Sequence, residues 1–271
     1  MLTHGSLFSG IGGFDFGFER VGIKTLWQVE CDPYCLKVLE KHWPCIVRRH
    51  NVRKVHREGT CSDVFRCDNC LIRVDIISAG WPCQPASIAG KRRGTADDRW
   101  LWPETHRVVK DLLPRWFVGE NVAGFSIYLD TVLADLEAIN YEARAVSIPA
   151  CAVGAWHPRQ RWFIVAHRNE RHHKQPDETI QTGGTSAIVS HADVPHANQP
   201  GLQRKRKEGS ARNGTWWSAE PRLARLVHGI SGRLYRRERI QALGNAIIPQ
   251  IAVEIGRMIL SVEAGTTPEG T

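Results

Sequence analysis

Short apolar runs alternate with longer polar stretches from the amino terminus of the chain to about residue 166. Seven of these runs have the length and apolar character of buried strands. They lie near residues 3–8, 24–29, 45–49, 74–79, 115–119, 142–148 and 161–166. Strands that alternate with helix-length segments are typical of α/β proteins. The pattern therefore predicts an α/β fold, with a mostly parallel sheet and helices on both of its faces.

The first predicted strand runs into a glycine-rich segment at residues 9–13, which a helix-length stretch follows. Glycines allow backbone N–H groups to approach a ligand closely and point a helix N-terminus at negative charge. The second strand ends in Glu30, about 20 residues after Gly10, where an acid binds ribose hydroxyls in dinucleotide-type folds. The segment has neither a Walker lysine nor a complete G-x-G-x-x-G. A nucleoside that carries a carboxylate, such as S-adenosylmethionine, therefore fits better than a pyrophosphate ligand.

The fourth predicted strand runs directly into a Pro-Cys-Gln-Pro turn at residues 82–85. This places Cys83 at the carboxyl end of a strand, which is where open α/β sheets carry their chemistry. The two flanking prolines make the turn stiff. The sequence therefore indicates a functional thiol at Cys83, and a buried structural cysteine is the alternative interpretation.

Two further strands carry charged side chains near their ends. Glu120 follows the strand at 115–119, and burial beside apolar neighbours would raise the pKa of its carboxyl and make it a proton donor. The alternative is a solvated acid that begins the next helix. Arg159 and Arg161 alternate onto one face of the strand at 161–166.

The last motif is Gly244-Asn245, four residues before Pro249. We expect a turn over residues 239–248, after which Pro249 opens a terminal helix that continues to about Leu260.

Together these motifs resemble the DNA (cytosine-5) methyltransferase family, in its short bacterial or phage type. The matching elements occur in family order: Phe8–Gly13, Glu30, Pro82–Gln84, Glu120–Val122, Arg159-x-Arg161 and Gly244-Asn245. The resemblance covers about residues 1–167 and 236–262. It implies the Rossmann-like fold of S-adenosylmethionine-dependent methyltransferases, with a small irregular target-recognition lobe.

The resemblance also implies roles for the catalytic side chains. Cys83 would be the nucleophile that adds to carbon 6 of a flipped-out cytosine, and Glu120 would contact the ring nitrogen and amino group. Arg161 would hold the carbonyl of the base, while Arg159 would support the loop that bears Cys83. Attack by a thiolate with protonation of the ring turns carbon 5 into a nucleophile that can accept a methyl group from a sulfonium.

Other residues would bind the cofactor and the DNA. The expected S-adenosyl-L-methionine contacts are Phe8, Ser9, Gly10, Gly12, Gly13, Glu30, Asn51, Pro82 and Asn245. Asn51 stands where the family generally has an aspartate, and its amide oxygen can still accept a hydrogen bond from adenine. The expected DNA contacts are Gln84, Ser87, Lys91, Arg92 and Arg93, because glycines flank three cations directly after the nucleophile. An exposed basic turn is the alternative for this loop.

Composition changes after the last predicted strand. Residues 168–233 are rich in Arg, His, Gly, Ser and Asn, with a basic cluster at 204–207 and a Trp pair at 216–217. We expect a short target-recognition region here, between a catalytic and cofactor-binding domain at 1–167 and a returning segment at 234–262, with a tail at 263–271. A disordered linker is the alternative. The net charge of +8 suits a polyanionic partner.

Cys61, Cys67 and Cys70 form a cluster with spacing typical of metal ligands. With His56 or His50 as a fourth ligand, they would bind a structural zinc ion. Free thiols in a surface insertion are the alternative.

No apolar run reaches membrane-spanning length, and no basic-then-apolar leader opens the chain. We therefore expect a monomer in the cytoplasm of a bacterial cell or a phage-infected host. It would act on double-stranded DNA, away from membranes, with a cognate restriction endonuclease that acts separately. Two alternatives stay open: a transfer-RNA cytosine-5 methyltransferase, which shares these motifs, and a catalytically silent DNA-binding homologue.

Overall fold

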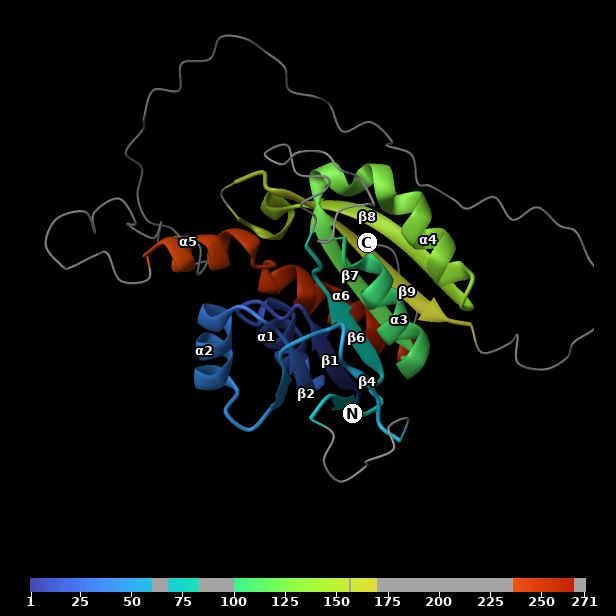
Figure 1. The fold of residues 1–271 in the computed structure, drawn as a ribbon. Helices are drawn as coiled ribbons and strands as arrows, with labels where there is room; N and C mark the ends of the chain where they lie inside the picture. Colours follow the sequence, from blue (N-terminus) through green and yellow to red (C-terminus); the bar gives the residue numbers. More distant parts are fainter. Residues whose placement is uncertain (60–67, 83–99, 156, 170–235, 266–271) are drawn as a thin grey trace, which may run out of the picture.

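The computed structural model describes residues 1–59, 68–82, 100–155, 157–169 and 236–265 (Figure 1). Its helices are α1 Gly13–Glu19, α2 Pro33–His42, α3 Trp102–Leu112, α4 Leu129–Glu137, α5 Arg236–Asn245 and α6 Pro249–Glu263, with short 3₁₀ helices at Ala123–Tyr128 and Ala150–Val153. Its strands are β1 Thr3–Leu7, β2 Lys24–Val29, β3 Val47–Arg49, β4 His56–Arg57, β5 Cys70–Leu71, β6 Ile76–Ala79, β7 Trp116–Val122, β8 Tyr141–Pro149 and β9 Gln160–Arg168.

Within these residues, seven strands form one sheet in the order β3-β2-β1-β6-β7-β9-β8. The pairs from β3 to β7 are parallel, whereas β9 runs antiparallel to both β7 and β8. The predicted α/β fold is confirmed, and each of the seven predicted strands is present. The parallel pair β4-β5 was not predicted, because strands of two residues show no hydrophobic period.

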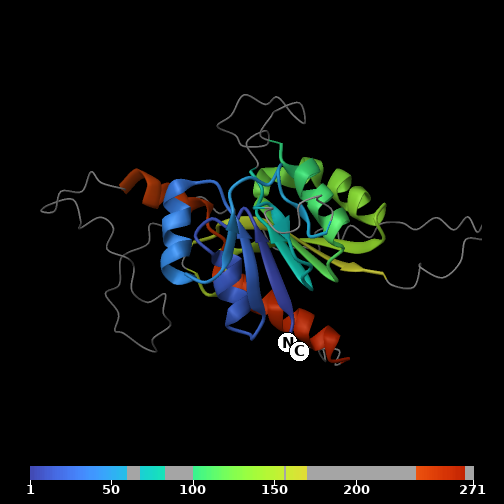
Figure 2. The ribbon, with the colours of Figure 1, turned by 60° about the horizontal axis from the view of Figure 1, so that its bottom comes forward.

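Helices cover both faces of the sheet (Figures 1 and 2), and each face has its own apolar core. Neighbouring residues of a strand point to opposite faces, so Phe117 of β7 packs in one core and Val118 in the other. The first core includes Trp102 and Val108 of α3, together with Val132 and Leu136 of α4. The second core includes Phe14 and Phe18 of α1, together with Ile251, Ile255 and Ile259 of α6.

The segment before α6 corrects one prediction. Residues 239–245 were expected to form a turn, but they belong to α5, and Gly244 and Asn245 are its last residues. Arg, Glu, Gln, Ala and Leu dominate this segment, and their helix propensity outweighs one glycine near the end. The helix that opens at Pro249 is confirmed, although it continues beyond Leu260 to Glu263.

Within the described residues, the segment Gln241–Glu263 is long and apolar enough to cross a membrane by length and composition alone. This corrects the expectation that no run reaches that length. Its α6 part places Ile251, Ala252 and Ile255 in the core against α1. Packing inside the protein therefore accounts for the apolar residues on this face of α6.

Helices α1 and α6 approach each other closely because glycines lie at their contact. A Cβ atom on Gly17 would collide with the Cβ of Ala252 and would lie 2.6 Å from the carbonyl oxygen of Pro249. A Cβ atom on Gly256 of α6 would lie 2.8 Å from the side chain of Val21. Through these contacts the carboxyl-terminal segment packs directly beside the glycine-rich loop that precedes α1.

We expect Gly17→Ala to lower the free energy of unfolding by about 1–3 kcal/mol, because backbone and core atoms occupy the space for the new methyl group. Helix propensity alone would predict a gain of about 1 kcal/mol. Gly244→Ala is the matched control, since nothing lies within 4 Å of its added Cβ. Urea unfolding of both variants checks this prediction, and equal stability of the two would contradict it.

Candidate functional site

The carboxyl ends of β1, β2 and β6 lie level with one another and with Gly119 of β7, which continues to Val122. Leu7 pairs with Val29 on one side and with Ala79 on the other, and Ala79 pairs with Gly119. The residues that follow these level positions are the glycine-rich loop, Glu30, the Gly80–Pro82 segment and, still within β7, Glu120. Residues far apart in the sequence therefore meet at one edge of the sheet.

The glycine-rich loop has a backbone that requires glycine. Gly10 and Gly12 have φ values of 56° and 85°, and Gly12 is the N-cap of α1. A Cβ atom on Gly12 would overlap the ring of Trp43. The backbone N–H of the buried Ser9 donates to the Val29 carbonyl over 3.1 Å, which ties the loop to the end of β2. Phe8, at φ 53°, adds local strain because a bulky side chain rarely adopts this region.

Glu30 is held beside this loop by backbone hydrogen bonds. One carboxylate oxygen accepts the N–H of Gly10 over 2.7 Å, and the other accepts the N–H groups of Cys31 and Asp32 over 2.8 Å each. A carboxylate has about four acceptor positions, so Glu30 can still accept a further hydrogen bond. Its contact with ribose hydroxyls stays a prediction.

Two hollows lie near the carboxyl ends of the first strands. A cavity of about 450 Å³ opens beside the glycine-rich loop, and its wall includes residues of α1, α2 and the 243–249 segment. His157 and Arg159 supply polar groups to it. A second hollow of about 460 Å³ lies past the end of β3, where Asn51 and several basic residues form the wall. Both volumes are in the range of small-molecule sites.

Glu120 is buried at the end of β7, with 8% of its surface exposed. Its Oε1 atom lies 2.9 Å from Nε of Arg161, which reaches across from the antiparallel β9. Burial raises the pKa of Glu120 from 4.5 to about 7, although Arg161 and Arg159 lower it. Its Oε2 atom lies 3.4 Å from the point where a Cβ on Gly80 would stand. The carboxyl group therefore faces the segment that leads into Cys83.

Arg159 and Arg161 have different partners. Nη2 of Arg159 donates to the carbonyl of Gly244 over 2.7 Å, and Arg161 donates to the Gln160 carbonyl over 2.9 Å besides its ion pair with Glu120. Burial lowers the pKa of Arg159, and the charge of Arg161 lowers it further. Support of the Cys83 loop by Arg159 stays a prediction. Among the described residues, the hydrogen bond from Arg159 to the Gly244 carbonyl connects the end of α5, next to Asn245, to the edge of the sheet where Glu120 lies.

Sequence reasoning missed the role of Asn121. This buried side chain donates from Nδ2 to the carbonyl of Trp81 over 3.3 Å, and its Oδ1 accepts the N–H of Val122 over 2.9 Å. Trp81 is itself buried against the rings of Trp102 and Phe125. Asn121 and this aromatic cluster together hold the chain immediately before Pro82 and Cys83. The Glu-Asn-Val motif was the available signal.

Several predicted site residues lie outside the described residues. They are Cys83, Gln84, Ser87, Lys91, Arg92, Arg93, Cys61 and Cys67, and nearly all of the predicted target-recognition region also lies outside.

The predicted zinc site is only partly within the described chain. Across the ranges that the structure describes, no group of three His, Cys, Asp or Glu side chains is placed to hold a metal ion. Cys70 and His56 are paired residues of β5 and β4, and their Sγ and Nε2 atoms lie 3.5 Å apart. Because Cys61 and Cys67 are not described, the zinc site stays a prediction.

Comparison with known proteins identifies the family. Residues 2–233 match the family model described as C-5 cytosine-specific DNA methylase. The chain is 32% identical over 165 residues to the type II methyltransferase M.HgiCII of Herpetosiphon aurantiacus, which is 59% of this chain and 36% of that protein. It is 33% identical over 190 residues to the type II methyltransferase M.AquIA of Picosynechococcus, which is 64% of this chain and 75% of that protein.

Among solved structures, the Entamoeba histolytica methyltransferase EhMeth has a TM-score of 0.50 at 20% identity, over 68% of this chain and 57% of that one. This likeness concerns the fold alone. The chain spans between a third and a half of two relatives, M.HgiCII at 36% and M.FnuDI of Fusobacterium nucleatum at 46%. The family match nevertheless covers most of the 271 residues and confirms the resemblance seen in the sequence. The chain belongs to the C-5 cytosine-specific DNA methylase family.

Proposed function

We propose that this protein is a DNA (cytosine-5-)-methyltransferase that methylates carbon 5 of a cytosine flipped out of double-stranded DNA. The observation that carries the proposal is the environment of Glu120. Its buried carboxyl has a pKa raised to about 7, pairs with Arg161, and faces the Gly80–Pro82 segment that precedes Cys83. Cytosine activation needs a proton donor of this kind beside a thiol.

In the proposed reaction, the Cys83 thiolate forms a bond to carbon 6 of the cytosine, and Glu120 gives a proton to ring nitrogen 3. The electron pair of the carbon 5–carbon 6 double bond then becomes available at carbon 5. After carbon 5 has gained the methyl group, it loses its proton to a base, and the thiolate leaves as the double bond forms again, while ring nitrogen 3 returns its proton to Glu120. A carboxyl with a pKa of about 7 is half protonated at neutral pH, so it can donate this proton.

Arg161 suits the binding of the base carbonyl. Its Nε lies against Glu120, and one Nη donates to the Gln160 carbonyl. The guanidinium has five N–H donors, which leaves donors for the base. Because the guanidinium would contact both the Glu120 carboxyl and the cytosine, Arg161 would align the carboxyl with the cytosine ring.

The residues of the glycine-rich loop fit S-adenosyl-L-methionine, which supplies an electrophilic methyl group when bound. Gly10 and Gly12 have left-handed backbone and no side chain of their own, and Glu30 stands beside the loop with an acceptor position to spare. A Cβ on Gly13 would lie 2.9 Å from the Ile247 carbonyl oxygen. The residues proposed to hold the cofactor are Phe8, Ser9, Gly10, Gly12, Gly13, Glu30, Asn51, Pro82 and Asn245.

The wider role follows from the family. Named relatives are type II methyltransferases, which supports a double-stranded DNA substrate and a separate cognate restriction endonuclease. We propose that residues 168–233 read the target sequence, since base-reading side chains must reach a groove whereas the catalytic lobe contacts the flipped base. We also propose that the protein is a monomer and that it acts in the cytoplasm.

Cys83→Ala should abolish methylation, because no thiolate remains to activate carbon 6, while cofactor binding persists. The exposed Cys45→Ala is the control and should be fully active. Bisulfite sequencing of DNA and of transfer RNA from cells that express each variant gives activity and substrate together. Wild-type protein should also form a denaturation-resistant adduct with 5-fluorocytosine DNA. Methylation by Cys83→Ala would refute the role of the thiol, and methylation of transfer RNA alone would refute the DNA substrate.

Glu120→Gln should lower kcat by about 10²–10⁴-fold, the usual contribution of a positioned acid. It should also change how stability depends on pH. Between pH 4.5 and 7 the folded wild type binds more protons at this carboxyl than the unfolded chain does, so its free energy of unfolding falls as pH rises. Relative to Glu120→Gln, the fall should total about 3 kcal/mol and should end above pH 7.

Urea unfolding of both proteins from pH 4.5 to 8 measures this difference. The exposed Glu142→Gln on β8 is the control and should follow the wild type at every pH. Parallel stability curves for wild type and Glu120→Gln would show that the carboxyl titrates at its ordinary pKa.

Glu30→Ala should weaken the binding of S-adenosylhomocysteine by about 1–3 kcal/mol, the range for hydrogen bonds to a charged group. The variant also removes the acceptor of the Gly10 N–H, so loop and ligand lose contacts together. Glu40→Ala, exposed on α2, is the control. Calorimetric titration measures the binding, and an unchanged dissociation constant for Glu30→Ala would place the cofactor elsewhere.

A further inference from the structure

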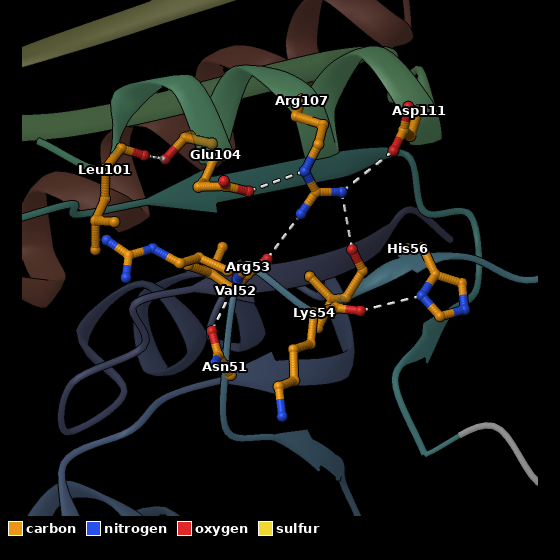
Figure 3. Close-up of polar contacts among 11 residues, drawn as sticks. Asn51, Val52, Arg53, Lys54, His56, Leu101, Glu104, Arg107 and Asp111 are labelled. Carbon is orange, nitrogen blue, oxygen red and sulfur yellow. Dashed lines mark hydrogen bonds and ion pairs between the residues drawn. The ribbon is translucent and has the colours of Figure 1, made fainter. Parts of the chain in front are cut away.

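The turn between β3 and β4 carries Asn51 in a fixed conformation. The Oδ1 atom of Asn51 accepts the N–H of Arg53 over 2.9 Å, and its backbone carbonyl accepts the N–H of Lys54 over 3.0 Å (Figure 3). An amide oxygen has two lone pairs, so Oδ1 can accept a second hydrogen bond. The side chain of Asn51 is exposed. The turn therefore defines where this acceptor stands while leaving it open to a ligand.

A single guanidinium from α3 holds this turn at two points. Nη2 of Arg107 donates to the carbonyl of Val52 over 2.8 Å, and Nη1 donates to the carbonyl of Val55 over 2.9 Å (Figure 3). The two acceptors lie near the two ends of the turn. The planar fork of arginine can reach both, whereas the ammonium of lysine is a single point of charge.

Arg107 is itself oriented by acids of its own helix. Nε donates to Glu104 over 2.9 Å, and Nη1 lies 3.4 Å from Asp111, one helical turn on either side (Figure 3). The side chains of Val52 and Val55 are buried in the same core as α3. The turn is thus attached to α3 by apolar contacts below it and by the guanidinium at its backbone.

We propose that Arg107 is a positioning residue for the adenine end of the cofactor site, and that it acts through Asn51. The proposal rests on the proposed function, in which Asn51 accepts a hydrogen bond from the adenine amino group. A neutral amide offers a weaker acceptor than a carboxylate, so its placement matters more. Arg107 makes no contact with the ligand in this scheme; it keeps Oδ1 of Asn51 at the place where the amino group arrives.

The test compares two ligands that differ at the purine position that Asn51 reads and in whether the adjacent ring nitrogen carries a proton. S-adenosylhomocysteine has an amino group on the purine, and S-inosylhomocysteine has a carbonyl oxygen there. Calorimetry on the full chain should show that the wild type prefers the adenine compound by about tenfold, as expected for one hydrogen bond. Arg107→Met should weaken binding of the adenine compound by about tenfold and change binding of the inosine compound by less than twofold.

The chain offers a matched control. Arg257 on α6 also pairs with a glutamate three residues earlier, with Nη1 2.7 Å from Oε1 of Glu254, and its side chain is 64% exposed. No contact of Arg257 reaches the turn that carries Asn51, so Arg257→Met should bind both ligands as the wild type does. Arg107→Lys keeps the charge but loses the fork, and its preference should be intermediate. If Arg107→Met does not fold, the Arg107→Lys variant provides the test in its place.

A double-mutant cycle separates positioning from general support. Asn51→Ala should abolish the preference for adenine, and adding Arg107→Met to it should cause no further change in preference. If substitution of Arg107 weakens the binding of both ligands equally, Arg107 has only a structural role. This result would overturn the positioning role of Arg107 and leave the proposed function standing. Unchanged binding in both Arg107 variants would do the same. Wild-type protein that binds neither compound would overturn the cofactor assignment, and this inference with it.

Discussion

The level register of the parallel strands β2, β1, β6 and β7 is the constraint on which the rest of the structure depends. A shift of one residue would turn every side chain of a strand to the opposite face and would move its carboxyl end away from the common edge. A hydrogen-bonded row inside the sheet makes such a shift costly. His4 contacts the hydroxyl of Thr25 over 3.0 Å on one side and that of Ser78 over 2.8 Å on the other. All three are buried, and burial lowers the pKa of His4 to about 3, so the ring stays neutral. A slipped strand would leave these groups without partners in the core.

Much of the fold could be predicted because its strands are long enough to be read as apolar runs. The α/β architecture and its seven strands follow from that pattern. What failed depends on context that local sequence does not carry. The strands of the pair β4-β5 have two residues each, and the turn before β4 is held by Arg107 of α3. The segment around Gly244 looked like a turn because glycine and asparagine are common there, whereas its preceding residues favour helix.

The site residues that belong to short sequence motifs could be predicted. Residues that act on parts of the chain far away in the sequence could not. The raised pKa expected for Glu120 from burial at a strand end is present. Arg107 gave no such signal. With Glu104 and Asp111 at helical spacing, it is typical of an exposed helix face, and only tertiary structure shows that its donors reach carbonyls more than 50 residues earlier. The contact of Asn121 with Trp81 was hidden for the same reason.

Arg159, just before β9, and Arg161, within β9, show how this edge of the sheet holds Glu120 beside two cations while its carboxyl can still be protonated. Their partners differ, because Arg159 donates to the Gly244 carbonyl whereas Arg161 pairs with Glu120. Both lower the pKa of Glu120, but desolvation is the larger effect. Arg159 donates a hydrogen bond to the end of α5; burial lowers its pKa, and repulsion from Arg161 lowers it further. The attachment of the carboxyl-terminal segment to Arg159 thus affects the pKa of Glu120. If Arg159 were free to turn toward Glu120, a second close cation would stabilise the carboxylate and lower the pKa of Glu120 further.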